Sequence, residues 1–173
     1  MLVYHIAGAI LLFRYIFRDP KVDVRMLVLG AVLPNLIDKP LGTLIAPGYF
    51  GADRLIGHSL LFPTAIMTLA LLLTRRGRRR RAIMAVAIGA MLHLLLDGMW
   101  TSTATFLWPV FGWAFDPGQA DYWGHLGGLF TPVAIGQELA GLAYLAYLYR
   151  SLGLSDPTFR KTLLTTGRLP VQA

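Results

Sequence analysis

The sequence contains no cysteine, and only 14% of its 173 residues are charged. Without cysteine there are no disulfides, no thiolate metal ligands and no cysteine nucleophile. Acidic residues are scarce as well, because 9 Asp and Glu stand against 16 Lys and Arg, a formal net charge of +7. Hydrophobic residues make up 55% of the chain. This composition is typical of a membrane protein and disfavours a soluble domain.

Long apolar runs predict an all-α fold, a polytopic transmembrane helical bundle of about five spans, some of them short or broken. Residues 1–149 are expected to form the membrane-embedded bundle with a metal site, and residues 150–173 a polar tail outside it. Basic residues follow the first apolar run and do not precede it, so we expect a retained helix and not a signal peptide. The expected spans are 1–17, 26–37 (broken at Pro34 and closed by Asp38), 55–74, 82–100 and 126–149.

The basic residues gather in three segments: Arg14–Arg25, Arg75–Arg81 and the tail. Cytoplasmic loops of membrane proteins collect Lys and Arg. Alternate crossing then places the N-terminus outside, and the Arg75–Arg81 loop and the C-terminus in the cytoplasm. This loop is expected to contact anionic phospholipid. Nucleic acid is the alternative partner for such a loop, but its place between two apolar spans disfavours that interpretation, so no nucleic acid is expected.

His93 and Asp97 lie inside one of the longest apolar runs. At positions i and i+4 of a helix they share one face, with Cβ atoms ~5–6 Å apart, so one ion can bridge both side chains. Ionisable residues at membrane depth usually mark function. The alternative is a buried His–Asp hydrogen bond that only holds helices together.

Counting ~1.5 Å per residue along each span brings five His and Asp residues to the middle and outer part of the membrane. Two unneutralised carboxylates there would be costly. A divalent cation removes that cost, and a His/Asp set suits zinc, with manganese or iron as alternatives, as one ion or two. A purely structural polar network is the competing interpretation. The expected ligands are His5, Asp38, His58, His93 and Asp97.

Three further residues lie at the outer edge of the expected site. Asp121 and His125 repeat the i, i+4 spacing in a loop, where an interfacial pair or cap is favoured over contact with a substrate headgroup. Arg54 lies one helical turn before His58. It is a candidate for holding an anionic headgroup, and an interfacial snorkelling arginine is the equal alternative.

Four short segments resemble the YdjM-like membrane-bound metal-dependent hydrolases. They are Gly30–Pro40, Arg54–Leu61, His93–Asp97 and Trp108–Trp113. The resemblance covers residues 1 to about 149 and implies a helical hydrolase in the plasma (inner) membrane of a bacterium or archaeon. The family pattern has Pro-Asp where this chain has Pro34-Asn35. Asn35 can still ligate a metal or hydrogen-bond, with one negative charge fewer.

The order His5, Asp38, His58, His93, Asp97 is also similar, more distantly, to the zinc-dependent phospholipase C and P1 nuclease group. That similarity implies a first metal on His58, His93, Asp38 and Asp97. It implies that His5 and Asp97 reach a second. The group's further His-x-x-x-Glu pair is not evident. His125 and Glu138 do not stand in that spacing, and Glu138 is at most a loose substitute.

These observations favour a metal-dependent hydrolase that acts on a lipid or other amphiphilic phosphoester at the outer face of the membrane. Asp38 is expected as a ligand or as the base that takes the water proton. A metal or proton transporter, or a metal sensor, that uses the same residues is the alternative. His125–Gly128 resembles the histidine helix of rhomboid proteases, but the Gly-x-Ser-Gly nucleophile of those enzymes is absent. The sequence makes no prediction of oligomeric state.

Overall fold

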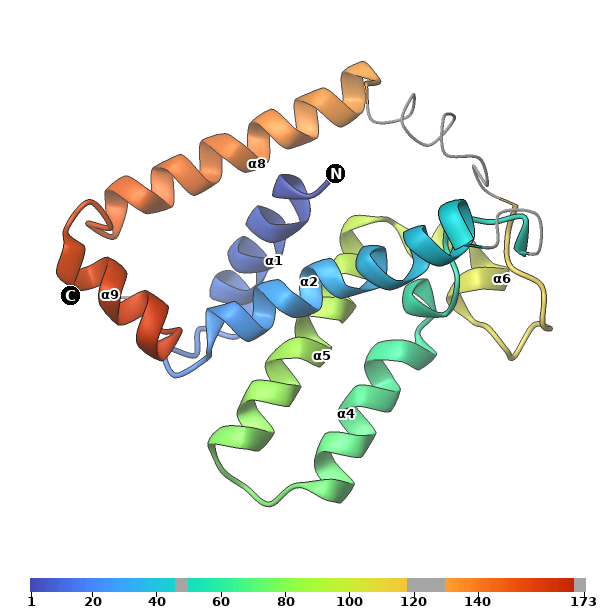
Figure 1. Ribbon diagram of the computed structural model, residues 1–173, viewed down its shortest axis with the longest axis horizontal. Coiled ribbons are helices and arrows are strands. Elements are labelled where there is room, and N and C mark those ends of the chain that lie inside the picture. Colours follow the sequence, from blue (N-terminus) through green and yellow to red (C-terminus); the bar gives the residue numbers. More distant parts are fainter. Residues whose placement is uncertain (46–49, 118–129, 170–173) are drawn as a thin grey trace.

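The computed structural model describes residues 1–45, 50–117 and 130–169 (Figure 1). The described residues form helices and connecting turns, without a strand, which confirms the all-α prediction. The elements are α1 (Val3–Ile16), α2 (Val24–Lys39), the π-helical turn η1 (Pro40–Ile45), the 3₁₀ turn η2 (Ile56–His58), α4 (Leu61–Leu73), α5 (Arg78–Leu96), the 3₁₀ turn η3 (Met99–Thr101), α6 (Thr103–Phe106), α8 (Pro132–Ser151) and α9 (Pro157–Thr166).

The centre of the fold is the pair α2 and α5, with α1 packed against both. Two glycines let these two backbones touch. A Cβ on Gly30 would lie 2.0 Å from the Val86 carbonyl oxygen, and one on Gly89 would lie 2.1 Å from that of Leu27. Small residues at such crossings are how membrane helices gain contact without a hydrophobic driving force. The core around the crossing is formed by Ala9, Phe13, Leu27, Ala31 and Leu92.

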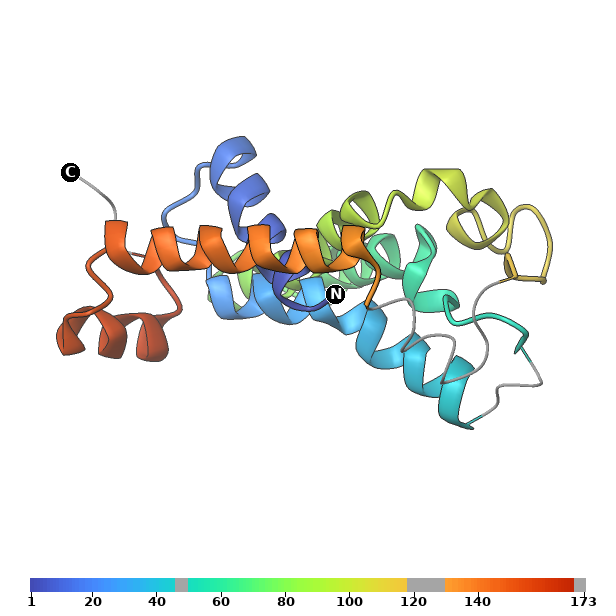
Figure 2. The same cartoon turned by 90° about the horizontal axis from the view of Figure 1, so that it is seen from above.

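The helices α4 and α5 form a hairpin that projects from this centre, and α8 lies along α1 on another side (Figures 1 and 2). Apolar side chains on α4 and α8 point outward: Leu72, Leu73 and Val133 are 75%, 76% and 71% exposed. Water is a poor environment for such surfaces, and lipid is a good one. The arrangement therefore suits a chain in contact with a bilayer.

Among the described residues, one helical segment is both long and apolar enough to cross a membrane: Val24–Ile45, with a mean hydropathy of 1.3. It combines α2 with the turn η1. The helices α1 and α4 are apolar but shorter. The expected number of about five spans therefore stays a prediction.

Four of the expected spans begin, end or break elsewhere than predicted. The fourth span is α5, Arg78–Leu96 in place of 82–100, and the last is α8, which begins at Pro132 in place of residue 126. The second is not broken at Pro34, because α2 continues through this residue to Lys39. The third does not begin at Leu55: its helix starts at Leu61, after the turn η2. The reason is the Asp38 carboxylate, which accepts hydrogen bonds from the backbone N–H groups of Leu55, Gly57 and His58. These N–H groups face a side chain, so His58 lies in a turn outside the helix.

The polar tail contains α9, and its end contacts the start of α2. The Val24 N–H donates to the Gly167 carbonyl oxygen at 2.7 Å, and Arg25 Nη1 donates to the Leu164 carbonyl oxygen at 2.6 Å. Asp23 caps α2 by accepting from the Arg25 N–H at 3.1 Å. The tail is therefore tied to the helical core at this point, which the expectation of a segment outside the bundle did not include.

Candidate metal centre

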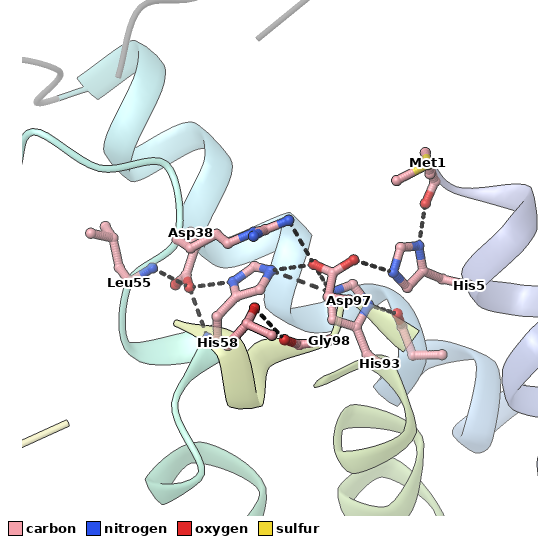
Figure 3. Close-up of polar contacts among 11 residues, drawn as sticks. Met1, His5, Asp38, Leu55, His58, His93, Asp97 and Gly98 are labelled. Atoms are coloured by element: carbon pink, nitrogen blue, oxygen red, sulfur yellow. Dashed lines mark hydrogen bonds and ion pairs between the residues drawn. The ribbon is translucent and has the colours of Figure 1, made fainter. Parts of the chain in front are cut away.

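Four of the expected ligands meet at one point, contributed by three separate parts of the chain (Figure 3). His5 comes from the first turn of α1, His58 from η2, and His93 with Asp97 from the C-terminal end of α5. The three histidines are 1%, 0% and 0% exposed, and the Asp97 side chain is 7% exposed. Four polar side chains are thus removed from solvent together.

The tightest group is formed by His58, His93 and Asp97. The Nε2 atoms of the two histidines are 3.3 Å apart. Asp97 Oδ2 lies 3.5 Å from His58 Nε2 and 3.6 Å from His93 Nε2. The predicted i, i+4 relation of His93 and Asp97 is therefore confirmed, with Asp97 as the residue that ends α5.

His5 reaches the same carboxylate from the other side. Its Nε2 lies 2.7 Å from Asp97 Oδ1, and its ring stacks on that of His93 with centroids 4.1 Å apart. His5, His93 and Asp97 each offer one ligand atom, and these atoms lie within 4.8 Å of one another. This group can hold a metal ion. Asp97 presents one oxygen to His5 and the other to His58 and His93.

In each of the three histidine rings, Nδ1 is bound on the outer side, so Nε2 is the nitrogen that faces the centre. The Nδ1 atoms of His5 and His93 meet the backbone carbonyl oxygens of Met1 and Ala31, and Nδ1 of His58 meets Asp38 Oδ2 at 2.7 Å. Because all three partners only accept hydrogen bonds, each Nδ1 carries the proton. Nε2 of His58 and Nε2 of His93, opposite these protonated nitrogens, present lone pairs to each other and to Asp97 Oδ2, whereas Nε2 of His5 lies within hydrogen-bond distance of Asp97 Oδ1. Metal-ligating histidines are oriented by outer contacts of this kind.

These lone pairs test whether a metal fits. Two neutral Nε2 atoms 3.3 Å apart repel each other unless a cation or an additional proton lies between them. A tetrahedral zinc ion with Zn–N bonds of ~2.0–2.1 Å has edges of roughly 3.3–3.4 Å between its ligand atoms. The separations of 3.3, 3.5 and 3.6 Å among His58, His93 and Asp97 are close to that length. The donor set therefore fits a divalent ion.

Asp38 has another place than that of a direct ligand. Its Oδ2 accepts from the backbone N–H groups of Leu55 and His58 and from His58 Nδ1, and its Oδ1 accepts from the Gly57 N–H. The carboxylate is fully buried. With its oxygens engaged in this way, Asp38 orients His58 and fixes its tautomer. The expectation that it ligates the metal or takes a proton from water is corrected to this outer role.

Arg54 lies at the open side of the centre. Its Nη2 is 3.5 Å from Asp97 Oδ2, and its side chain is 40% exposed. The structure thus brings this guanidinium to the expected site, between the buried carboxylate and the exterior. A cation at this position can pair with a negatively charged group that approaches the metal.

Glu138 does not lie at the centre, so the suggestion that it substitutes for a ligand is wrong. Its Oε2 accepts hydrogen bonds from the N–H groups of Val3 and Tyr4, at 2.9 and 3.2 Å. These are unpaired donors at the start of α1, and Glu138 caps them from α8. Its connection to the site is indirect, because the turn that it caps carries His5.

The remaining expected residues are not brought into the centre by a contact. Asn35 lies on α2 between Ala31 and Asp38, and in the described part of the chain its buried Oδ1 has no hydrogen-bond partner. Asp121 and His125 lie outside the described residues. Sequence reasoning missed the carbonyls of Met1 and Ala31. Backbone acceptors carry no residue signature, so no pattern in the sequence marks them.

Comparisons with known proteins agree with the motif resemblance. A family model described as YdjM inner membrane protein matches residues 1–157. No curated protein and no solved structure matches the chain. The more distant similarity to zinc-dependent phospholipase C and P1 nuclease is therefore without a match that supports it.

Proposed function

The chain belongs to the YdjM inner membrane protein family, and on that premise we propose that it is an integral-membrane, metal-dependent hydrolase. The proposed substrate is a lipid or other amphiphilic phosphoester at the outer face of the membrane. The proposed metal is zinc, as one ion or two. The family description supports the membrane location, and the reaction is our inference from the site.

One observation carries this proposal: the Nε2 atoms of His58 and His93 lie 3.3 Å apart beside Asp97 Oδ2 in a buried centre, while both Nδ1 atoms are engaged by acceptors on the other side of their rings. A hydrogen-bonded network that served only structure would alternate donors and acceptors. This centre instead gathers acceptors. A divalent ion satisfies it and, when bound, lowers the pKa of a bound water and stabilises negative charge on a phosphoryl oxygen.

The position of each residue at the centre suggests its role in the proposed reaction. His58, His93 and Asp97 Oδ2 would hold the ion, and Asp38 keeps His58 in its ligating tautomer. Arg54 would bind the anionic group of the substrate, since it is the guanidinium placed beside Asp97 on the open side. His5, whose Nε2 meets Asp97 Oδ1, would position this carboxylate or, together with it, hold a second ion.

The proposed orientation places the centre outside and the basic segments in the cytoplasm. The centre lies at the start of α1 and the ends of α2 and α5, whereas Arg14, Arg25 and Arg81 lie at the opposite ends of these helices. The loop after α6 supports the outer location of the centre: Phe111 and Trp113 are 69% and 78% exposed. Exposed aromatic side chains are typical of membrane–water interfaces.

Metal content and hydrolysis, measured together, test the proposal. Detergent-purified protein is analysed by inductively coupled plasma mass spectrometry and assayed with short-chain phospholipids and aryl phosphodiesters. We expect stoichiometric zinc and phosphoester cleavage in the wild type, and neither in Asp97→Ala. Asp156→Ala removes an exposed carboxylate from the tail and serves as the matched control.

Three outcomes would overturn the proposal. One is folded wild-type protein without metal. Another is full activity in folded Asp97→Ala protein. The third is metal-loaded protein that cleaves no phosphoester but moves the ion across proteoliposome membranes, which would replace the hydrolase with a transporter.

A further inference from the structure

A basic cavity of about 200 Å³ lies at the other end of the helices from the metal centre. Its cationic lining residues are Lys21, Arg78, Arg81 and Arg168, joined by Asp23 and Thr166. Along α5 alone, Arg81 and Asp97 are separated by ~24 Å at ~1.5 Å per residue. The cavity is therefore distinct from the proposed active site.

The described residues do not neutralise the positive charge of this cavity. Among the residues that the structure describes, none of the four cations has a carboxylate within ion-pair distance. The one acidic lining residue, Asp23, is engaged by Arg25, with Nη2 at 2.7 Å from Oδ2 and Nε at 3.0 Å from Oδ1. These hydrogen bonds hold the pKa of the Asp23 carboxyl below its ordinary value. Asp23 thus stays ionised and paired with Arg25.

Two of the cations occupy the least favourable turn of their helix. Arg78 and Arg81 belong to the first turn of α5, and the N-cap residue Gly77 has no side chain to cap it. The N-terminus of a helix carries partial positive charge, which repels cations and attracts anions. Like charges gathered at this point favour a bound anion that compensates both the arginines and the helix end.

The tail holds the fourth cation in a defined position. Gly167 adopts a left-handed conformation (φ 70°), and a Cβ on it would lie 1.8 Å from Asp23 Oδ1. With the Val24 and Arg25 contacts to the tail, this close fit sets one register for α9 against α2. Arg168 follows directly, so the docked tail delivers it to the cavity beside Arg78 and Arg81.

We propose that this cavity binds a phosphate-bearing anion. The shared chemistry is a phosphate group that accepts hydrogen bonds from three arginines and a lysine, which come from three chain segments. Its source is either the headgroup of an anionic phospholipid in the surrounding membrane or a free phosphate. The anion site requires the docked tail. The proposal of this site does not depend on hydrolase activity at the metal centre.

Binding is measured on the full-length protein in detergent by microscale thermophoresis. The probes are dioctanoyl phosphatidylglycerol, dioctanoyl phosphatidylcholine and inorganic phosphate. We expect Arg168→Gln and Arg81→Gln each to weaken phosphatidylglycerol binding roughly fivefold, the effect of about one basic residue near an anionic surface. Arg76→Gln and Arg79→Gln remove the same charge from positions that do not line the cavity, and should change binding less than twofold.

The probes also separate the two sources. Binding of inorganic phosphate that displaces phosphatidylglycerol identifies the free anion, whereas phosphatidylglycerol binding that phosphate does not displace identifies the lipid headgroup. Equal losses in the cavity variants and the control variants would overturn the proposal, because they would indicate general surface charge. Unchanged binding in Arg168→Gln or equal affinity for phosphatidylcholine would overturn it as well.

Discussion

The candidate metal centre joins two halves of the molecule that are built differently. One half is the crossing of α2 and α5, where Gly30 and Gly89 allow backbone contact and where His93 and Asp97 lie on one helix end. The other half is the first turn of α1, held from α8, which supplies His5 alone. The crossing therefore positions His93 and Asp97, and the turn η2 beside it adds His58, whereas α1 adds one ligand through a capped helix start.

The difference also appears in how close the helices come. A Cβ added to either glycine of the α2–α5 crossing would lie 2.0 or 2.1 Å from a backbone oxygen, but one on Gly141, where α8 meets α1, would lie 2.9 Å from Tyr4 Cα. A backbone that touches another backbone cannot shift without moving a whole helix. We infer that the crossing determines whether the centre forms and that α1 determines how it works.

The strongest test of this comparison is Gly89→Ala. The added methyl group would overlap the Leu27 carbonyl oxygen and approach the Ala31 nitrogen at 2.8 Å, and overpacking costs typically about 1–3 kcal/mol, here toward the upper end. Ala31 also supplies the carbonyl that orients His93. We expect loss of both thermal stability in detergent and bound metal.

The matched control for that variant is Gly136→Ala on α8, where an added Cβ meets nothing within 4 Å in the described structure. Alanine there should be neutral or slightly stabilising, since it favours the helix by up to ~1 kcal/mol. A Gly89→Ala protein as stable as Gly136→Ala would show that the crossing is not the rigid half.

A second test removes one histidine from each half. His93→Ala should reduce metal content to background, because the ion loses a ligand from the group of His58, His93 and Asp97. The His5 ring also loses the ring on which it stacks. His5→Ala should leave the first ion bound and lower phosphoester cleavage. Metal analysis of both variants beside the wild type checks this. Equal loss of metal in both would make His5 an equal partner in one site, and the two-half comparison would fail.

Asp38→Asn tests the outer contact within the rigid half. The asparagine keeps the size of the side chain and one acceptor, but it loses the charge that holds the His58 Nδ1 proton. Loss of such an outer partner typically lowers metal affinity 10–100-fold. Competition titration with a zinc chelator measures the change. Unaltered affinity with unaltered stability would show that Asp38 serves only to cap the turn from Leu55 to His58.

The rigid half is also the half that sequence reasoning predicted best. His93 and Asp97 are four residues apart in a helix, so their shared face follows from helical geometry alone. Depth counting along expected spans grouped His5 and His58 with this pair, and the structure brings their side chains to Asp97, although His58 lies in the turn η2 and not in a spanning helix. The depth of a residue in the membrane is counted from the charged end of its span at ~1.5 Å per residue, so an error of a few residues in a helix boundary changes it little.

The direction in which a side chain points was harder to predict than its depth in the membrane. Asp38 was expected as a ligand and Glu138 as at most a loose substitute for one, yet one faces the 55–58 turn and the other the start of α1. A carboxylate is drawn to whichever unpaired N–H groups the tertiary structure exposes. Those groups lie in segments far away in the sequence, so composition and periodicity carry no record of them. Only the assembled helices distinguish a ligand from a cap.

The mildest expected effect comes from Glu138→Ala, which removes the cap of α1 without touching a ligand. Two N–H groups lose their acceptor, and loss of a helix cap costs typically ~1 kcal/mol. His5 should then sample more orientations, so cleavage should fall roughly fivefold, the rate equivalent of that energy, while metal content stays unchanged. Gln137→Ala, the preceding position on α8, is the control and should retain both. If Glu138→Ala lost metal as His93→Ala does, the helix start would belong to the rigid half after all, and α8 would be required to form the centre.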